Sequence, residues 1–253
     1  NIIGGEIYMQ AENFVAHRGW RKHYPENTLI AFEKAIEAGA VNIELDIQLS
    51  ADGVPFVFHD ASLMRMCQRE GLIWEHNAAE LDSFYASESY RLGDAFLRNP
   101  MCRLSDIVTL LEAHPKVNAY VEIKEESLSQ FGEQIVVDAV INTLRSVASR
   151  CILISFELNA LHLALHEGWK RFGAVFDVWP DWQSTALVEL KPEVIFCDRN
   201  CVPVDADFTT LPWPILIYEV GSKVEAETWF TRGAAAVESF LIGELLAEFS
   251  LDT

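Results

Sequence analysis

Several features that would assign this sequence of 253 residues to a familiar class are missing from it. No apolar run reaches the roughly 18 residues that can span a membrane. The first residues lack a basic start followed by an apolar stretch, so no secretory signal is expected, and Met9 is a candidate for the native first residue. No tract rich in glycine, serine and proline divides the chain. We therefore expect a single domain over residues 1–253.

Positive charge is also scarce. The chain has 19 Lys and Arg against 38 Asp and Glu, which gives a net charge of −19. This balance argues against nucleic acid as a partner and against stable association with anionic membranes. An anionic small-molecule substrate would also be repelled at long range, so its binding would need a bound cation and local basic side chains.

Cysteines are few and do not form a metal-binding pattern. Their number is odd and their spacing is scattered, which indicates reduced thiols in a cytoplasmic protein. Cys197 and Cys201 have no further cysteine or histidine nearby, so we do not expect them to hold a metal. The five positions are Cys67, Cys102, Cys151, Cys197 and Cys201.

Chemically useful side chains are concentrated in the first quarter of the chain. His17, Arg18, Glu44, Asp46 and His59 lie within about 45 residues. Cleavage of a phosphodiester requires a cation near the phosphoryl oxygens and an acid for the departing alkoxide. This set of residue types provides both. No other segment offers a comparable set.

Two apolar runs carry carboxylates on one face. Residues 41–47 alternate apolar and polar positions, so Glu44 and Asp46 point the same way on a predicted strand. In a second run, residues 117–124, Glu122 and Lys124 share a face. Taken alone, each pair also fits the solvated face of a strand. The combination with two histidines favours a site in which carboxylate oxygens bind a hard cation.

Short apolar strands alternate with amphipathic helices along the whole chain, which predicts a parallel sheet covered by helices. Eight strands are expected, the number of a TIM (β/α)8 barrel. They are 14–17, 41–47, 117–123, 151–155, 172–178, 193–197, 214–220 and 235–239. The predicted helices are 27–38, 105–113, 130–147, 157–167 and 223–231.

The strand ends carry the candidate site. Active sites of such barrels lie at the C-terminal ends of the strands, where His17, Asp46, Glu122, Phe156 and Glu238 fall. His59 is expected on the return arm of an excursion after the second strand, with a turn at 51–53. Residues 60–102 are too long for an ordinary connection, and we expect them to form a small inserted region that caps the barrel mouth.

These motifs, in this order and spacing, resemble the glycerophosphodiester phosphodiesterase family. The resemblance is dense over residues 14–65 and thin after 157. The motifs that carry it are His17-Arg18-Gly19, Pro25-Glu26-Asn27-Thr28, Ile43-Glu44-Leu45-Asp46, Asp52-Gly53, His59-Asp60, Glu122-Ile123-Lys124 and Ile154-Ser155-Phe156-Glu157. Two C-terminal motifs depart from the family pattern, at residues 218–221 and at residues 239–240, and this puts the pocket for the alcohol in doubt.

The resemblance implies roles for individual residues. It implies a divalent cation, Mg²⁺ or Ca²⁺, on Glu44, Asp46 and Glu122, with magnesium favoured by a cytoplasmic setting. It implies His17 and His59 as the acid–base pair, and Arg18 and Lys124 as phosphate-binding residues. The secondary site candidates are Glu26, Phe156, Tyr218 and Glu238.

Some roles stay open at this point. Arg18 contacts the phosphate or pairs with an acid such as Glu26, while Glu26 and Asn27 either lie near the site or only cap the first helix. The sequence does not decide which histidine is the acid and which is the base.

The expected activity is metal-dependent hydrolysis of a small glycerophosphodiester to an alcohol and glycerol 3-phosphate. The nucleophile is water or a neighbouring glycerol hydroxyl. A lysophospholipase D or C-like activity is an alternative, because the inserted region is rich in apolar side chains. A catalytically silent barrel that binds a phosphorylated ligand is a second alternative. A homodimer also stays open, because nothing in the sequence locates an interface.

Overall fold

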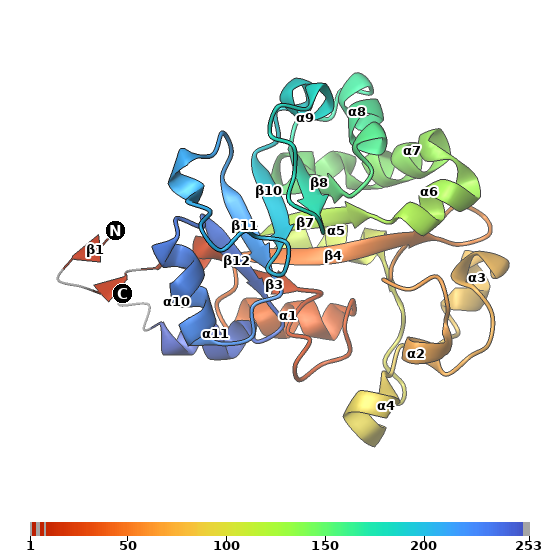
Figure 1. The fold of residues 1–253 in the computed structure, drawn as a ribbon. Helices are drawn as coiled ribbons and strands as arrows, with labels where there is room; N and C mark the ends of the chain where they lie inside the picture. The colour runs from red at the N-terminus through yellow and green to blue at the C-terminus, as the bar shows by residue number, and fades with distance from the viewer. Residues whose placement is uncertain (1, 4–5, 8, 250–253) are drawn as a thin grey trace.

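Eight parallel strands close into a barrel with helices around it (Figure 1). The computed structural model describes residues 2–3, 6–7 and 9–249. Each strand pairs with the next along the chain, and β3 closes the barrel by pairing with both β12 and β4. The barrel strands are β3 (Phe14–His17), β4 (Asn42–Leu49), β7 (Asn118–Ile123), β8 (Cys151–Ser155), β9 (Phe172–Phe176), β10 (Val194–Asp198), β11 (Ile215–Tyr218) and β12 (Ala236–Ser239). The predicted TIM barrel and all eight of its strands are confirmed.

Most of the predicted helices are present, but several differ from the sequence pattern. The helix predicted at 130–147 begins too early, because Gly132 has a φ of 86° and ends α-helical backbone there, so α7 starts at Glu133. The preceding helix α6 was not predicted apart from its last two residues. The end of that segment, residues 145–150, is a 3₁₀ helix. Helices α9 and α11 were not predicted. The outer helices are α1 (Leu29–Glu37), α5 (Leu104–Ala113), α6 (Glu125–Phe131), α7 (Glu133–Leu144), α8 (Leu158–His166), α9 (Thr185–Leu190), α10 (Lys223–Thr231) and α11 (Ile242–Glu248).

Side-chain alternation on β4 divides its residues between two environments. Ile43, Leu45 and Ile47 are fully buried and belong to the large core that also contains residues of the outer helices. Glu44 and Asp46 take the alternate positions, and successive side chains of a strand point to opposite faces. They therefore face the interior of the barrel, where apolar residues of six other strands form a separate cluster.

The chain leaves the barrel after β4 in the predicted excursion. The chain turns at Ser50, whose carbonyl accepts a 2.9 Å hydrogen bond from Gly53, and returns as β5 (Pro55–Val57), antiparallel to β4. The excursion ends with β6 (Cys102–Arg103), which is antiparallel to β5. Between them lie α2 (Met64–Cys67), α3 (Ala78–Leu81) and α4 (Ser89–Leu92), to the lower right of the barrel in Figure 1.

The excursion has a small hydrophobic core of its own, which includes Phe58, Leu63, Met66 and Ile73. At the N-terminus, β1 (Ile2–Ile3) and β2 (Glu6–Ile7) form an antiparallel pair. Across the residues that the structure describes, no helix is both long enough and apolar enough to cross a membrane.

Candidate active site

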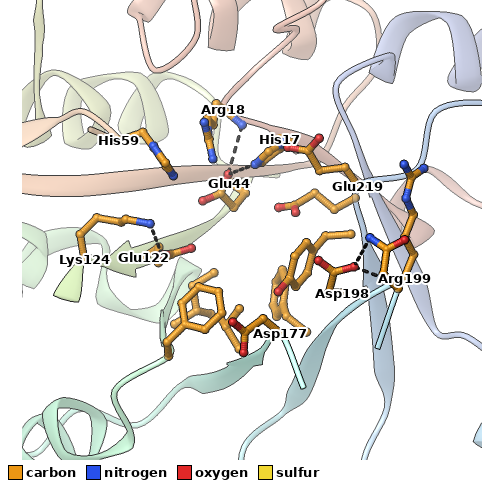
Figure 2. A pocket seen from close by; sticks show the side chains of 17 residues that line it. His17, Arg18, Glu44, His59, Glu122, Lys124, Asp177, Asp198, Arg199 and Glu219 are labelled. Atoms are coloured by element: carbon orange, nitrogen blue, oxygen red, sulfur yellow. Dashed lines mark hydrogen bonds and ion pairs between the residues drawn. The ribbon is translucent and has the colours of Figure 1, made fainter. Parts of the chain in front are cut away.

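A cavity of about 370 Å³ opens at the C-terminal ends of the barrel strands. Nine of the eleven residues predicted for the site line it, and Figure 2 shows many of them pointing inward. Asp46 and Glu26 are the two that do not line it, and both are buried beside it. The predicted residues that line the cavity are His17, Arg18, Glu44, His59, Glu122, Lys124, Phe156, Tyr218 and Glu238.

Three carboxylates converge on one side of the cavity. Asp46 on β4 lies in register with Glu122 on β7, and Glu44 precedes Asp46 by two positions on the same strand face. One oxygen of each lies within 4.8 Å of the others. Glu44 and Glu122 have raised pKa values, because burial and then the neighbouring carboxylates disfavour their ionised forms.

This arrangement suits a divalent cation. Glu44 Oε1 is buried and has no hydrogen-bond partner, and an unpartnered buried oxygen is costly unless a ligand satisfies it. Hard cations such as Mg²⁺ and Ca²⁺ prefer carboxylate oxygens. Glu44, Asp46 and Glu122 therefore have the donor chemistry and convergence that such a cation requires.

Two cationic side chains flank the carboxylates. Lys124 Nζ lies 2.8 Å from Glu122 Oε1 and 3.7 Å from Asp46 Oδ1. Arg18 Nε lies 3.0 Å from Asp46 Oδ2, and the Arg18 backbone N–H donates to Glu44 at 3.1 Å. Burial opposes ionisation of Asp46, but Arg18, together with His59, Lys124 and the hydrogen bond from Asn27, holds the pKa of that carboxyl below its usual range. Lys124 and Arg18 both line the cavity, where an anionic ligand would meet them.

Glu26 does not act as a helix cap. The cap position of α1 is Thr28, whereas Glu26 is only 1% exposed and forms ion pairs with three arginines. Arg18 approaches at 2.9 Å, Arg21 at 2.9 Å and Arg65 at 2.7 Å. Burial would raise the pKa of Glu26, but the arginines, with Arg18 the strongest, lower it to about 2. Arg18 therefore pairs with Glu26 and also lines the cavity.

Asn27, the other proposed cap, bonds to a site carboxylate instead. Its side-chain amide donates to Asp46 Oδ2 at 2.8 Å, and its carbonyl oxygen accepts from the Asp46 backbone N–H at 3.3 Å. Asn27 adopts the left-handed region with φ 55°, which asparagine tolerates better than most residues. The motif at 25–28 therefore holds Asp46 in place.

His17 lies at the end of β3 between two carboxylates. Its Nδ1 is 3.0 Å from Glu219 Oε1, and its Nε2 is 3.9 Å from Glu44 Oε2 (Figure 2). Burial and then the charge of Arg18 lower the pKa of His17 to about 4, although Glu219 opposes this shift. Arg21 also contacts Glu219 at 2.8 Å. His17 is therefore held in one orientation and is neutral near pH 7.

Sequence reasoning did not identify Glu219 as a site residue. It noted only that residues 218–221 depart from the family pattern. The hydrogen bond with His17 is the largest cause that lowers the pKa of Glu219, and the positive charges of His17 and Arg21 lower it further, to about 2. An acid near the end of the strand predicted at 214–220 was the signal available, because that position places a side chain near the mouth of the barrel.

His59 is the second histidine of the site and has a carboxylate partner as well. Its Nδ1 lies 2.6 Å from Asp60 Oδ1, and Asp60 Oδ2 accepts a 2.7 Å bond from Arg65 Nε. The His59 carbonyl accepts from Gln48 on β4 at 3.0 Å. The inserted region thus orients His59 through Asp60 and Arg65. Among the described residues, none from 60–102 lines the cavity itself.

The opposite wall of the cavity combines aromatic and acidic residues. Phe156 and Tyr218 lie there as predicted secondary candidates, and the Tyr218 hydroxyl donates to the Phe176 carbonyl at 3.0 Å. Asp177 and Asp198 also line this wall (Figure 2), and sequence reasoning missed both. Asp177 directly follows β9, and Asp198 is the last residue of β10. A search of the strand ends for polar residues, which identified His17, would therefore also have identified these two.

Comparison with known proteins shows where this architecture occurs. The model of the glycerophosphoryl diester phosphodiesterase family matches residues 17–166. A glycerophosphodiester phosphodiesterase of Bacillus altitudinis is 33% identical over 148 residues, which cover 58% of this chain and 59% of that protein. A protein of the same name from Caldanaerobacter subterraneus is 36% identical over 97 residues, 38% of this chain and 39% of its own. The aligned region is therefore well under two thirds of either relative.

Solved structures share the fold over nearly the whole chain. A phosphodiesterase of Oleispira antarctica, in complex with the product sn-glycerol-3-phosphate, has a TM-score of 0.82 at 23% identity and covers 93% of this chain and 95% of its own. A glycerophosphodiester phosphodiesterase of Thermotoga maritima has a TM-score of 0.72 at 22% identity, with coverage of 93% and 97%. At these identities the likeness concerns the fold. Because the family model covers more than half of the residues, including both histidines and all three convergent carboxylates, the chain belongs to the glycerophosphoryl diester phosphodiesterase family.

Proposed function

We propose that this protein hydrolyses small glycerophosphodiesters to an alcohol and glycerol 3-phosphate. The observation that carries the proposal is that His17 and His59 line one cavity with Glu44, Glu122 and Lys124. Each histidine is paired with a carboxylate, His17 with Glu219 and His59 with Asp60. The structurally similar phosphodiesterase of Oleispira antarctica binds sn-glycerol-3-phosphate as its product, which supports the same product here.

The two histidines would transfer the protons of the reaction. An oxygen of water attacks phosphorus, the bond from phosphorus to the alcohol oxygen breaks, and one histidine accepts the proton of the attacking water. The other histidine donates a proton to the departing alcohol oxygen. Histidine suits both tasks because its ordinary pKa lies near neutrality. The paired carboxylates fix the ring orientations and stabilise the imidazolium formed in the first transfer.

The phosphate would bind between the cationic side chains. Lys124 and Arg18 approach the cavity from β7 and β3, where they would offset the negative charge of the transition state. Glu44, Asp46 and Glu122 would hold Mg²⁺ or Ca²⁺, which when bound polarises a phosphoryl oxygen as a Lewis acid. The convergence of these three carboxylates supports the requirement for a cation.

The two alternatives receive less support. The lysophospholipid alternative depended on apolar side chains of the inserted region. Leu63, Met66 and Ile73 are at most 1% exposed and fill that region's own core, whereas Met64 is 40% exposed. None of the described residues from 60–102 lines the cavity, so these side chains do not form its mouth. A silent binding barrel has no use for two histidines that each have an orienting carboxylate. The small polar cavity therefore favours a glycerophosphodiester.

Release of glycerol 3-phosphate from glycerophosphocholine and glycerophosphoethanolamine tests the proposal. The assay compares Mg²⁺, Ca²⁺ and EDTA for the wild type, His17→Ala and His59→Ala. We expect cation-dependent turnover that falls at least a hundredfold in either variant. Turnover by either variant close to that of the wild type would contradict the acid–base roles. No turnover with any cation would refute the proposed substrate class.

A further inference from the structure

Glu238 is a buried carboxylate that the proposed reaction does not use. It lies on β12, is 3% exposed, and its Oε1 has no hydrogen-bond partner. None of the described residues forms an ion pair with its side chain. Burying a carboxylate without a partner costs several kcal/mol, and such groups usually meet a cation or another ligand. Glu238 therefore requires an explanation beyond packing.

Its neighbours complete a ligand set that differs from the three-carboxylate cluster. A carboxylate oxygen of Glu238, a carboxylate oxygen of Glu44 and a ring nitrogen of His17 lie within 4.8 Å of one another. All three residues are buried. Glu44 belongs to both groups, and its Oε1 is the other carboxylate oxygen here without a hydrogen-bond partner. Two unpartnered buried oxygens thus accompany one ring nitrogen.

Glu219 leaves that ring nitrogen available. A carboxylate only accepts hydrogen bonds, and the 3.0 Å contact of His17 Nδ1 with Glu219 is shorter than its 3.4 Å contact with the Arg21 guanidinium, so we assign the ring proton to Nδ1. Nε2 then carries the lone pair, and it is the atom directed toward Glu44 (Figure 2). Histidines that bind metals characteristically donate their other ring N–H to a carboxylate in this way.

We propose a second divalent-cation site on His17 Nε2, Glu44 and Glu238, which takes a borderline cation such as Zn²⁺ in preference to Mg²⁺ or Ca²⁺. Zn²⁺ binds both imidazole nitrogen and carboxylate oxygen, and imidazole is a ligand that suits Zn²⁺ better than it suits Mg²⁺ or Ca²⁺. Mg²⁺ and Ca²⁺ prefer ligand sets made of oxygen only. The three-carboxylate cluster and this site therefore differ in cation preference.

Zinc at this site would inhibit the enzyme. Binding occupies His17 Nε2, and the histidine then neither accepts nor donates a proton. This consequence rests on the proposed acid–base role of His17, whereas zinc binding itself does not. Measurements of binding without substrate keep the two questions separate.

Calorimetric titration with Zn²⁺ and with Ca²⁺ tests the site in the wild type and in two matched variants. Glu238→Gln should weaken Zn²⁺ binding at least tenfold and change Ca²⁺ binding much less. Glu122→Gln should weaken Ca²⁺ binding at least tenfold and retain Zn²⁺ binding. Both substitutions keep the side-chain shape and introduce no charge, so both variants are expected to fold. Wild-type affinity for Zn²⁺ in Glu238→Gln would overturn the proposal.

Nitrogen-15 NMR of labelled histidine in the wild type is an independent measurement that needs no variant. Zn²⁺ should shift the Nε2 resonance of His17, and Ca²⁺ should leave that resonance near its position in the cation-free protein. A Zn²⁺ titration that leaves His17 Nε2 unchanged would also overturn the proposal. Inhibition of turnover is then measured separately. Zinc binding without inhibition would refute the proton-transfer role of His17 and leave the site itself standing.

Discussion

Glu26→Gln should destabilise the protein by about 3 kcal/mol at neutral pH. Glu26 is almost fully buried, and its three arginine partners, Arg18 chief among them, lower its pKa from 4.5 to about 2. A shift of one unit corresponds to about 1.36 kcal/mol, so the ionised form stabilises the folded state by about 3 kcal/mol. Breaking a buried ion pair by removing one partner costs a similar amount, about 3–5 kcal/mol.

The effect should depend on pH in a defined direction. The folded-state pKa of Glu26 is depressed, so its stabilisation is fully present above about pH 4.5 and is lost as pH falls toward about 2. The difference between wild type and Glu26→Gln should therefore shrink to about 1 kcal/mol at pH 3. At pH 3 the pH is still about one unit above the folded-state pKa of Glu26, so the carboxylate is mostly ionised and some difference should remain.

Urea unfolding at pH 7 and at pH 3 measures the loss of stability in Glu26→Gln and the change of that loss with pH. For a chain of this size, 3 kcal/mol corresponds to a Tm decrease of about 6–12 °C. Glu225→Gln is the matched control, because Glu225 pairs with the partly exposed Arg199 at 3.0 Å, and such surface pairs contribute about 1 kcal/mol or less. A loss below about 1 kcal/mol in Glu26→Gln, or one that does not change with pH, would refute the reasoning.

Three further predictions follow from other contacts. Glu219→Gln should lower kcat about tenfold and change KM much less, because it disturbs the orientation and charge stabilisation of His17; steady-state kinetics would show this, and an unchanged kcat would refute it. Gly19→Ala should cost more than about 2 kcal/mol in urea unfolding, because Gly19 has φ 82° and an added Cβ would lie 2.6 Å from the Ala31 carbonyl carbon. Mg²⁺ or Ca²⁺ at about 100 times its Kd should stabilise the fold by about 2.7 kcal/mol in thermal unfolding; Glu122→Gln should abolish most of that gain, and the same gain in this variant would place the cation elsewhere.

Local sequence pattern was sufficient to predict the barrel. Strands such as residues 151–155 are short apolar segments between amphipathic helices, and that alternation reports burial directly. The helix predicted at 130–147 was placed wrongly because apolar periodicity continued across Gly132, where the backbone cannot remain α-helical. Helices α9 and α11 are short, with six and seven residues, and carry too little periodicity to be recognised.

The sequence also located most of the candidate site, because its motifs lie at strand ends and a barrel brings those ends together. It could not assign partners. Glu26 looked like a capping residue, and only the folded chain shows it surrounded by Arg18, Arg21 and Arg65. The pairing of Glu219 with His17 joins residues 202 positions apart (219 − 17), a contact that no local pattern encodes.

The sequence by itself determined the barrel, the strand faces and the residue types that meet at its mouth, because hydrophobic periodicity and strand position are local properties. Tertiary structure decided the charge environment: which carboxylates are paired, which oxygens of Glu44 and Glu238 stay without partners, and which ring nitrogen of His17 is free. These properties depend on distances of a few ångströms between side chains of different strands, because Coulomb interactions and hydrogen bonds change steeply over that range.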